Sequence, residues 1–166
     1  DEGVKSRRKF MVKDGVITEF MHNRETAAKM NLESNGSARA KKFSYEPIIR
    51  MSNTLLLPGN YSEDEMIKDI KKGVYIKNFM EWNIDDMRFH QKYVGNEAYL
   101  IENGELTKPV KSPALEITTP VLWSSVDAVG NNSAAFAGNC GKGEPMQGIP
   151  VWMGGPSVRL RNIKLS

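Results

Sequence analysis

Residues 98–110 of the chain read AYLIENGELTKPV, and this stretch predicts a β-hairpin. Asn103 and Gly104 separate two segments rich in apolar and β-branched residues, and an Asn-Gly pair readily adopts the positive φ angles of a tight hairpin turn. Pro109 has no backbone N–H to donate, so we expect the second strand to end there or to lie at a sheet edge.

A second hairpin is predicted over residues 10–20, where Asp14 and Gly15 stand at the turn between two apolar segments. Residues 74–80 are rich in β-branched and aromatic side chains and predict a buried strand. Closing strands are predicted at residues 150–152 and 157–163.

The helices are expected to be short and few. Ser62 and Glu65 form a capping box, and the helix that they begin is expected to bury its apolar face and to end at Gly73. Residues 24–30 and 119–129 predict two further short helices. Residues 33–42 are polar and predict a mobile loop, and residues 131–148 are rich in Gly, Asn and Ala, as turn segments are. The fold class is therefore α+β, a β-rich domain of mixed or antiparallel sheet with a few short helices.

Composition narrows the function classes. The chain has 166 residues, and 40% of them are hydrophobic. This number of apolar residues is enough to bury a core, so we expect one domain over residues 1–166. Apart from two basic clusters, residues 5–9 and 39–42, which we interpret as solvated, the 23 basic and 20 acidic residues are scattered, so no basic face for nucleic acid is predicted. No apolar run reaches the roughly 20 residues that cross a bilayer. The first residues lack an initiator Met and a signal peptide, so we expect the chain to begin inside a longer, soluble, cytoplasmic protein.

The single cysteine, Cys140, lies in the run GNCGKG, residues 138–143. A lone thiol forms no intrachain disulfide, and its thiolate can bind zinc or attack a carbonyl, but an inert buried thiol is the commoner fate of such a residue. The two histidines, His22 and His90, do not form the helical His pair of a catalytic metal site, and we interpret both as structural or surface residues. Cys140 therefore resembles one part of a site whose other members are missing.

Several other polar and aromatic residues have two interpretations. The apolar segments around Arg50 and Asn53 predict that these side chains point inward, into a buried hydrogen-bond network or, less favoured, against a substrate. Lys142 either orients a substrate carboxylate or is solvated. Trp123 and Trp152 are interpreted as core residues rather than as platforms for a cofactor.

Taken together, the ordered motifs resemble the TldD/PmbA family. The resemblance covers nearly the whole chain but only the carboxy-terminal part of a family member. It rests on these segments: Asp1-Glu2-Gly3, His22-Asn23-Arg24-Glu25-Thr26-Ala27, Arg50-Met51-Ser52-Asn53-Thr54, Pro58-Gly59, residues 98–104, Lys108-Pro109-Val110-Lys111 and Cys140-Gly141-Lys142.

The resemblance implies a zinc peptidase of a family formerly described as modulators of DNA gyrase. In the TldD branch two histidines of a His-Glu-x-x-x-His helix and a downstream cysteine bind zinc, and Cys140 matches that cysteine. The helix belongs upstream of Asp1, so no catalytic residue and no bound zinc are expected in this chain alone. The implied substrates are small or unfolded peptides, which Arg50, Asn53 and Lys142 are candidates to contact.

The implied assembly is a homodimer or a heterodimer with a TldD/PmbA-type subunit, without nucleic acid or membrane. The alternative is a non-catalytic assembly module of the PmbA type, a branch that lacks the metal site. DNA binding, suggested by the old gyrase name, is a third possibility that the scattered charges argue against.

Overall fold

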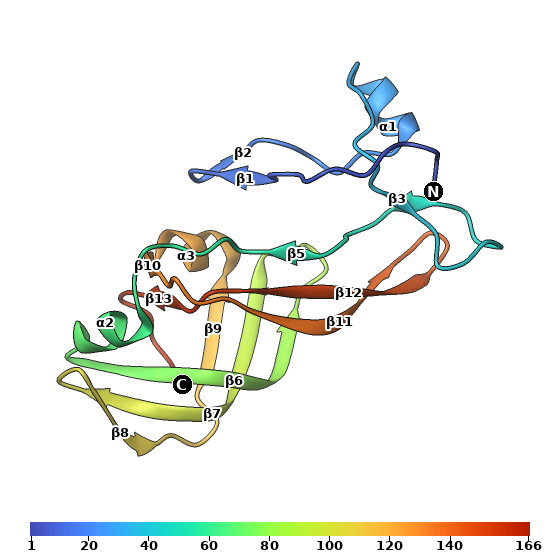
Figure 1. The fold of residues 1–166 in the computed structure, drawn as a ribbon. Helices are drawn as coiled ribbons and strands as arrows, with labels where there is room; N and C mark the ends of the chain where they lie inside the picture. The colour runs from blue at the N-terminus through green and yellow to red at the C-terminus, as the bar shows by residue number, and fades with distance from the viewer. The chain divides into compact units, whose positions relative to one another are not determined.

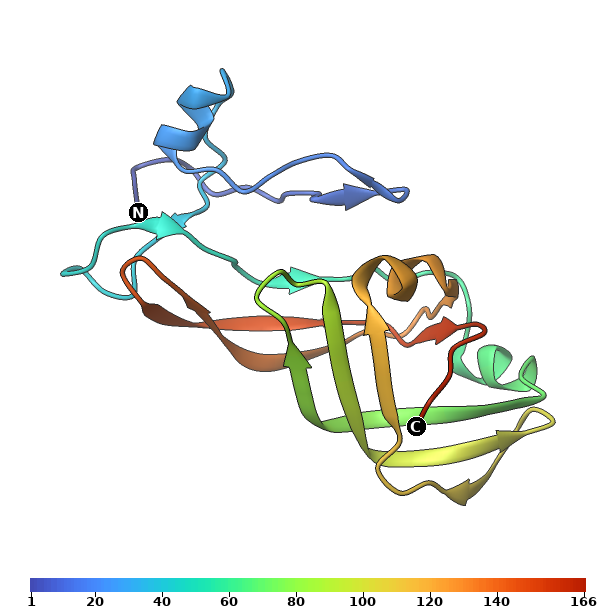
Figure 2. The ribbon, with the colours of Figure 1, turned by 180° about the vertical axis from the view of Figure 1, so that it is seen from behind.

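A computed structural model describes residues 1–166, which form thirteen strands and three short helices (Figures 1 and 2). The chain divides into two compact units. Unit 1 comprises residues 1–55 and 135–154, and unit 2 comprises residues 56–134 and 155–166. The strand-rich α+β class predicted from the sequence is confirmed.

A four-stranded antiparallel sheet forms the centre of unit 2. Its strands are β6 (Lys72–Ile84), β7 (His90–Glu102), β8 (Glu105–Pro109) and β9 (Ala114–Thr118). The long strand β7 pairs with β6 along one side, and with β8 and β9 in succession along the other (Figure 1).

The hairpin that the sequence predicts most directly is the β7–β8 connection. Asn103 and Gly104 have φ angles of 52° and 83°, the left-handed pair that a type I′ turn requires. Pro109 ends β8, and β8 lies at an edge of the sheet, as expected. The turn chemistry thus fixes this part of the register locally.

Two of the three helices follow their capping signals. Helix α1 (Arg24–Lys29) matches the predicted residues, and α2 (Glu63–Lys68) begins with the predicted capping box. In that box the Glu65 carboxylate accepts from the backbone N–H of Ser62 at 2.8 Å. The expected end of this helix at Gly73 is wrong, because the chain leaves the helix at Asp69 and Gly73 already belongs to β6.

The predicted helix over residues 119–129 is only half correct. Helix α3 (Thr119–Ser124) is followed by strand β10 (Val126–Val129), which pairs with β13 (Val158–Leu160). The β-branched valines of this segment suit a strand, and their partner lies some 30 residues further along the chain, which local periodicity cannot reveal. None of the helices has the length and the apolar character needed to cross a membrane.

Three burial expectations are also wrong. The strand expected over residues 74–80 exists within β6, but its second half is exposed rather than buried. Trp123 and Trp152 are 59% and 52% exposed, so neither is a core residue. The buried apolar side chains are few and mostly small or β-branched: Ala27, Ala38, Met66, Ala98, Ile101, Ile117, Ala128, Ile149 and Val151.

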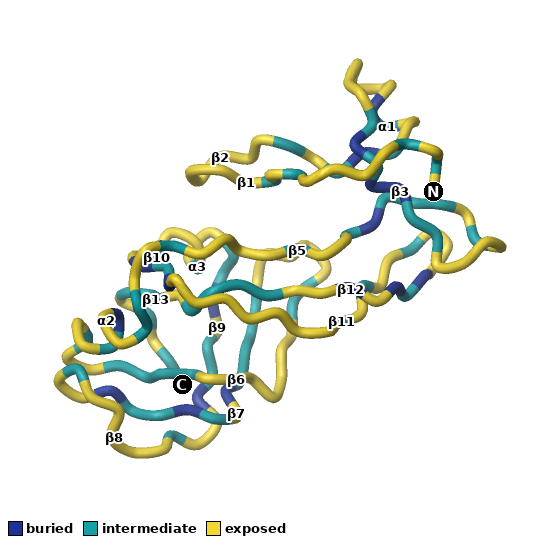
Figure 3. Tube along the Cα trace, viewed as in Figure 1, coloured by how far each residue is buried: buried dark blue, intermediate teal, exposed yellow.

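Unit 1 is built from short strand pairs. Strands β1 (Val12–Lys13) and β2 (Val16–Ile17) form the predicted hairpin, shorter than expected and exposed on both strands (Figure 3). Strands β3 (Ala38–Arg39) and β4 (Ile48–Ile49) pair antiparallel. A three-stranded sheet has the order β11-β12-β5, formed by β11 (Ala134–Lys142), β12 (Gln147–Gly155) and β5 (Thr54–Leu55).

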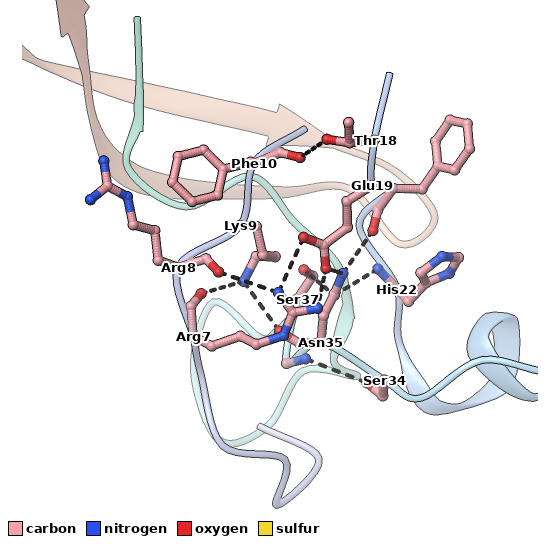
Figure 4. Close-up of polar contacts among 12 residues, drawn as sticks. Arg7, Arg8, Lys9, Phe10, Thr18, Glu19, His22, Ser34, Asn35 and Ser37 are labelled. Atoms are coloured by element: carbon pink, nitrogen blue, oxygen red, sulfur yellow. Dashed lines mark hydrogen bonds and ion pairs between the residues drawn. The ribbon is translucent and has the colours of Figure 1, made fainter. Parts of the chain in front are cut away.

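The predicted mobile loop at residues 33–42 is instead an ordered part of unit 1. Asn35 is buried, and its side-chain oxygen accepts from His22 N at 3.0 Å and from Ser37 Oγ at 2.8 Å (Figure 4). Its side-chain nitrogen donates to Phe20 O at 2.7 Å and to Glu19 Oε1 at 3.0 Å. A buried amide with all its bonding groups engaged stabilises one conformation, so the polarity of this segment reflects an internal network and not solvation.

Candidate functional site

Cys140 lies near the end of β11, the edge strand of the three-stranded sheet in unit 1. The expectation of a turn-rich segment over residues 131–148 is wrong for most of that length, because only residues 143–146 form a turn and the rest pairs mainly as β11 and the start of β12. The thiol is free and half-buried. A half-buried thiol on an edge strand remains accessible to a metal ion or to another part of a site.

Small residues let β11 pack closely beside its neighbours. A Cβ added at Gly138 would lie 2.4 Å from Cε of Met153, so glycine is required for this approach unless that flexible side chain moves. Gly141 and Gly143 have open space around their Cα atoms. Of the glycines of GNCGKG, Gly138 therefore lies in close contact with the end of the Met153 side chain, whereas Gly141 and Gly143 have room for a side chain of their own.

Arg50 forms hydrogen bonds with the backbone of the strand that carries Cys140 and with that of its neighbour β12. Its side chain is 1% exposed, its Nη1 donates to Gln147 O at 2.8 Å, and its Nη2 donates to the backbone carbonyl of Cys140. The Nε atom is buried without a partner. The structure therefore places Arg50 in a buried hydrogen-bond network, the interpretation favoured from the sequence, and one of its bonds reaches Cys140 itself.

Gln147, at the start of β12, is a member of this network that the sequence reasoning missed. It is 0% exposed, its Oε1 accepts from Lys41 N at 2.8 Å, and its Nε2 donates to Glu46 O at 2.9 Å. The signal that could have revealed it is an uncharged amide three residues before the strand predicted at residues 150–152. Its partners lie about 100 residues away in sequence, so only the fold identifies them.

Asn53 and Lys142, the other two candidate contacts of substrate, both bond to backbone atoms. The inward orientation expected for Asn53 is wrong: the residue is exposed, and its Oδ1 accepts from Trp152 N at 3.0 Å. Lys142 is exposed and its Nζ donates to Ile49 O at 2.7 Å. Both side chains therefore hold the β11-β12-β5 sheet to the neighbouring segment of unit 1 while remaining accessible.

The two histidines do not join Cys140. His22 is 4% exposed, with Nδ1 3.3 Å from Thr26 Oγ1 and a buried Nε2 that has no partner. His90 is exposed and lies on β7, in unit 2. No group of three His, Cys, Asp or Glu side chains gathers anywhere in the chain. Its own residues therefore offer zinc a single thiolate, and they do not fit a complete zinc site.

The profile of the family described as "PmbA/TldA metallopeptidase C-terminal domain" matches residues 1–166, the whole chain. The chain belongs to the TldD/PmbA family. A "Metalloprotease" of Methanothermobacter thermautotrophicus is 39% identical over 97% of this chain and 35% of its own length. A "Zinc metalloprotease TldD homolog" of Saccharolobus solfataricus is 27% identical over 99% of this chain and 37% of its own length.

The fold is that of TldD/PmbA proteins of known structure. The crystal structure of TldE from Thermococcus kodakarensis superposes with a TM-score of 0.79 at 18% sequence identity, covering 99% of this chain and 35% of the other. The family membership expected from the motifs is confirmed by the profile match over the whole chain and by the 39% identity to the Methanothermobacter protein. The chain spans about a third of the length of the curated relatives that it matches.

Proposed function

We propose that this chain is the carboxy-terminal part of a TldD-like, zinc-dependent metallopeptidase in which Cys140 is one zinc ligand. The observation that carries the proposal is the setting of the only thiol, accessible on an edge strand and with its carbonyl bound by a buried arginine. Two relatives support the proposal by their names, one a metalloprotease and the other a zinc metalloprotease.

A zinc ion with three protein ligands keeps a fourth position for water and lowers the pKa of that water to about 7. Cys140 would supply one of the three ligands as thiolate. The other two would be the histidines of the His-Glu-x-x-x-His helix that the family resemblance implies, outside this chain. The catalytic base would come from the same helix, so no residue of this chain is assigned a catalytic role.

The substrate class that we propose is small or unfolded peptides. Strand β11 has a neighbour on one side only, and an extended peptide can add to such an edge through backbone hydrogen bonds, whatever its side chains. Lys142, on β11 itself, is exposed and available to contact such a peptide, whereas Arg50 is buried and would act by holding the strand. Asn53 precedes β5, at the opposite edge of the sheet, and would contact only a substrate that reaches that edge.

The working assembly that we propose is a dimer, either of two copies or with a TldD/PmbA-type partner subunit. We also infer a cytoplasmic location, because a thiolate ligand must stay reduced and an unpaired cysteine suits a reducing compartment. The alternative, a non-catalytic assembly module, differs in one respect that can be measured: its complete protein would hold no zinc.

The test compares the complete protein with its Cys140→Ser variant. We expect about one zinc ion per active subunit and hydrolysis of unfolded peptides by the first, and loss of both by the second. Ala137→Ser, on the same exposed strand, is the matched control and should keep metal and activity. If the complete protein is free of zinc and Cys140→Ser changes nothing, the assembly module replaces the peptidase.

A further inference from the structure

The outer edge of β9, in unit 2, carries backbone groups that the chain itself does not use. Strand β9 pairs with β7, and Pro113, directly before β9, accepts a hydrogen bond from Gly95 N. The odd-numbered residues from 113 to 117 therefore turn their backbone polar groups toward β7. Successive residues of a strand turn these groups to opposite sides. Three residues therefore turn theirs outward: Ala114, Glu116 and Thr118.

Only the first of these three has a partner. Ala114 exchanges two backbone hydrogen bonds with Ser166, at 2.7 and 3.0 Å. The N–H and C=O of Glu116 and the N–H of Thr118 make no hydrogen bond in the structure. Strand pairing along this edge thus begins at Ser166 and stops after one residue pair.

The carboxy-terminal segment is unable to continue that pairing in its present conformation. In the antiparallel register set by Ser166, Asn162 would lie opposite Thr118. Asn162 has a φ of 58°, which is far from the extended values of a strand. Figure 2 shows the consequence: β9 and the carboxy-terminal segment meet near Ser166 and diverge away from it.

A cavity of about 790 Å³ lies along this divergence. Its apolar lining includes Ile84, Ile117, Val121 and Ile163. Lys164 also lines it and forms no ion pair, whereas the two lining residues Lys92 and Glu116 pair with each other at 3.2 Å. The size falls within the range of small-ligand sites. Asp85 also lines the cavity, but its carboxylate accepts from the backbone N–H groups of Phe89 and His90, so Lys164 is left as the lining cation without a side-chain partner.

We propose that the edge of β9 binds an extended peptide segment, antiparallel to β9 and between it and residues 162–164. The bound peptide forms backbone hydrogen bonds with the unused N–H and C=O groups of Glu116 and Thr118. One of its side chains is apolar and lies over the isoleucines and the valine of the cavity, and another is acidic and lies near Lys164. An extended peptide satisfies unused donors and acceptors at this spacing, which a compact ligand cannot do. This site goes beyond the proposed peptidase function and needs no zinc.

The test titrates a blocked pentapeptide of alternating valine and glutamate into the complete protein carrying Cys140→Ser, where hydrolysis is not expected. We expect saturable binding in the millimolar range and slower hydrogen exchange at the Glu116 and Thr118 amides. Thr118→Pro should weaken binding about tenfold or more, because it removes one donor and places a ring against the incoming strand. The φ of −89° at Thr118 accommodates proline with little strain.

Thr118→Ala is the matched control, because it changes the side chain and keeps the backbone N–H; its binding should stay within about twofold of the parent. An N-methylated form of the same peptide should fail to bind the unaltered edge, which tests the proposal even if Thr118→Pro is poorly folded. Binding that is unaffected by Thr118→Pro or by N-methylation, or no binding at all, overturns the proposal. Binding that requires Cys140 also overturns it, since the peptide would then occupy a different site.

Discussion

Arg50 puts a permanent positive charge in the interior of unit 1 without a carboxylate to balance it. The guanidinium is bound by two backbone carbonyls, those of Cys140 and Gln147, and its Nε has no partner. Carbonyl dipoles compensate a buried cation only while their geometry is kept. Arg50 therefore stabilises one particular position of the Cys140 strand and would be costly in any other arrangement.

Replacing Arg50 by lysine tests this geometry, since Lys keeps the charge but has no planar fork to reach both carbonyls. We expect Arg50→Lys to lower the free energy of unfolding by about 1–3 kcal/mol, the usual cost of a buried group left without its partner. Urea denaturation gives the value. Lys142→Gln, which replaces an exposed charged donor to a carbonyl by a shorter neutral one, should cost less than about 0.5 kcal/mol. Equal effects of the two substitutions would contradict a positioning role for Arg50.

At the scale of elements, the strand pair β10–β13 is joined by ion pairs as well as by backbone bonds. Asp127 on β10 accepts from Arg159 Nε and Nη2, both at 2.9 Å, and from Arg161 Nε at 2.7 Å. Arg159, on β13, also pairs with Asp69 at 3.0 Å. The two-pronged contact of Arg159 fixes the relative position of the strands where their register shifts.

These contacts make the stability of unit 2 depend on pH. The hydrogen bonds from Arg159, followed by those from Arg161, lower the pKa of Asp127 from 3.8 to about 2. Because the folded state has the lower pKa, the stabilisation is complete above pH 4 and is lost as the pH falls from about 4 to 2. Since a third of this side chain is exposed, we expect a loss of only about 1 kcal/mol.

Asp127→Asn should remove that part of the acid dependence, which unfolding curves measured at several pH values between 2 and 5 would show. Asp86→Asn removes an exposed carboxylate that makes no ion pair and serves as the control. An acid transition of Asp127→Asn as steep as that of the unaltered protein would mean that other groups cause it.

Across the whole molecule, the sequence predicted correctly those features that depend on residues close together in the chain. The turn at Asn103-Gly104 and the cap at Ser62 follow from backbone preferences within four residues, and both are confirmed. Strand β11 was missed because glycine and alanine have little strand preference, so its pairing with β12 decides its conformation. Gln147 was missed because its hydrogen bonds cross about 100 residues of chain. The sequence indicated both Cys140 and Arg50, but not the hydrogen bond that joins them across 90 residues of chain.

We propose that the zinc ligands are divided between this chain and the rest of a longer protein, and this arrangement can be tested by zinc affinity. A chelator competition should show tight zinc binding by the complete protein and no tight, Cys140-dependent binding by residues 1–166 alone. The reason is that a single thiolate, with no second or third ligand gathered near it, cannot replace enough of the hydration shell of zinc. Cys140→Ser should then abolish the tight binding of the complete protein and leave the isolated chain unchanged. Tight zinc binding by the isolated chain that Cys140→Ser removes would instead require further ligands within residues 1–166, with His22 the first to examine because its buried Nε2 has no partner.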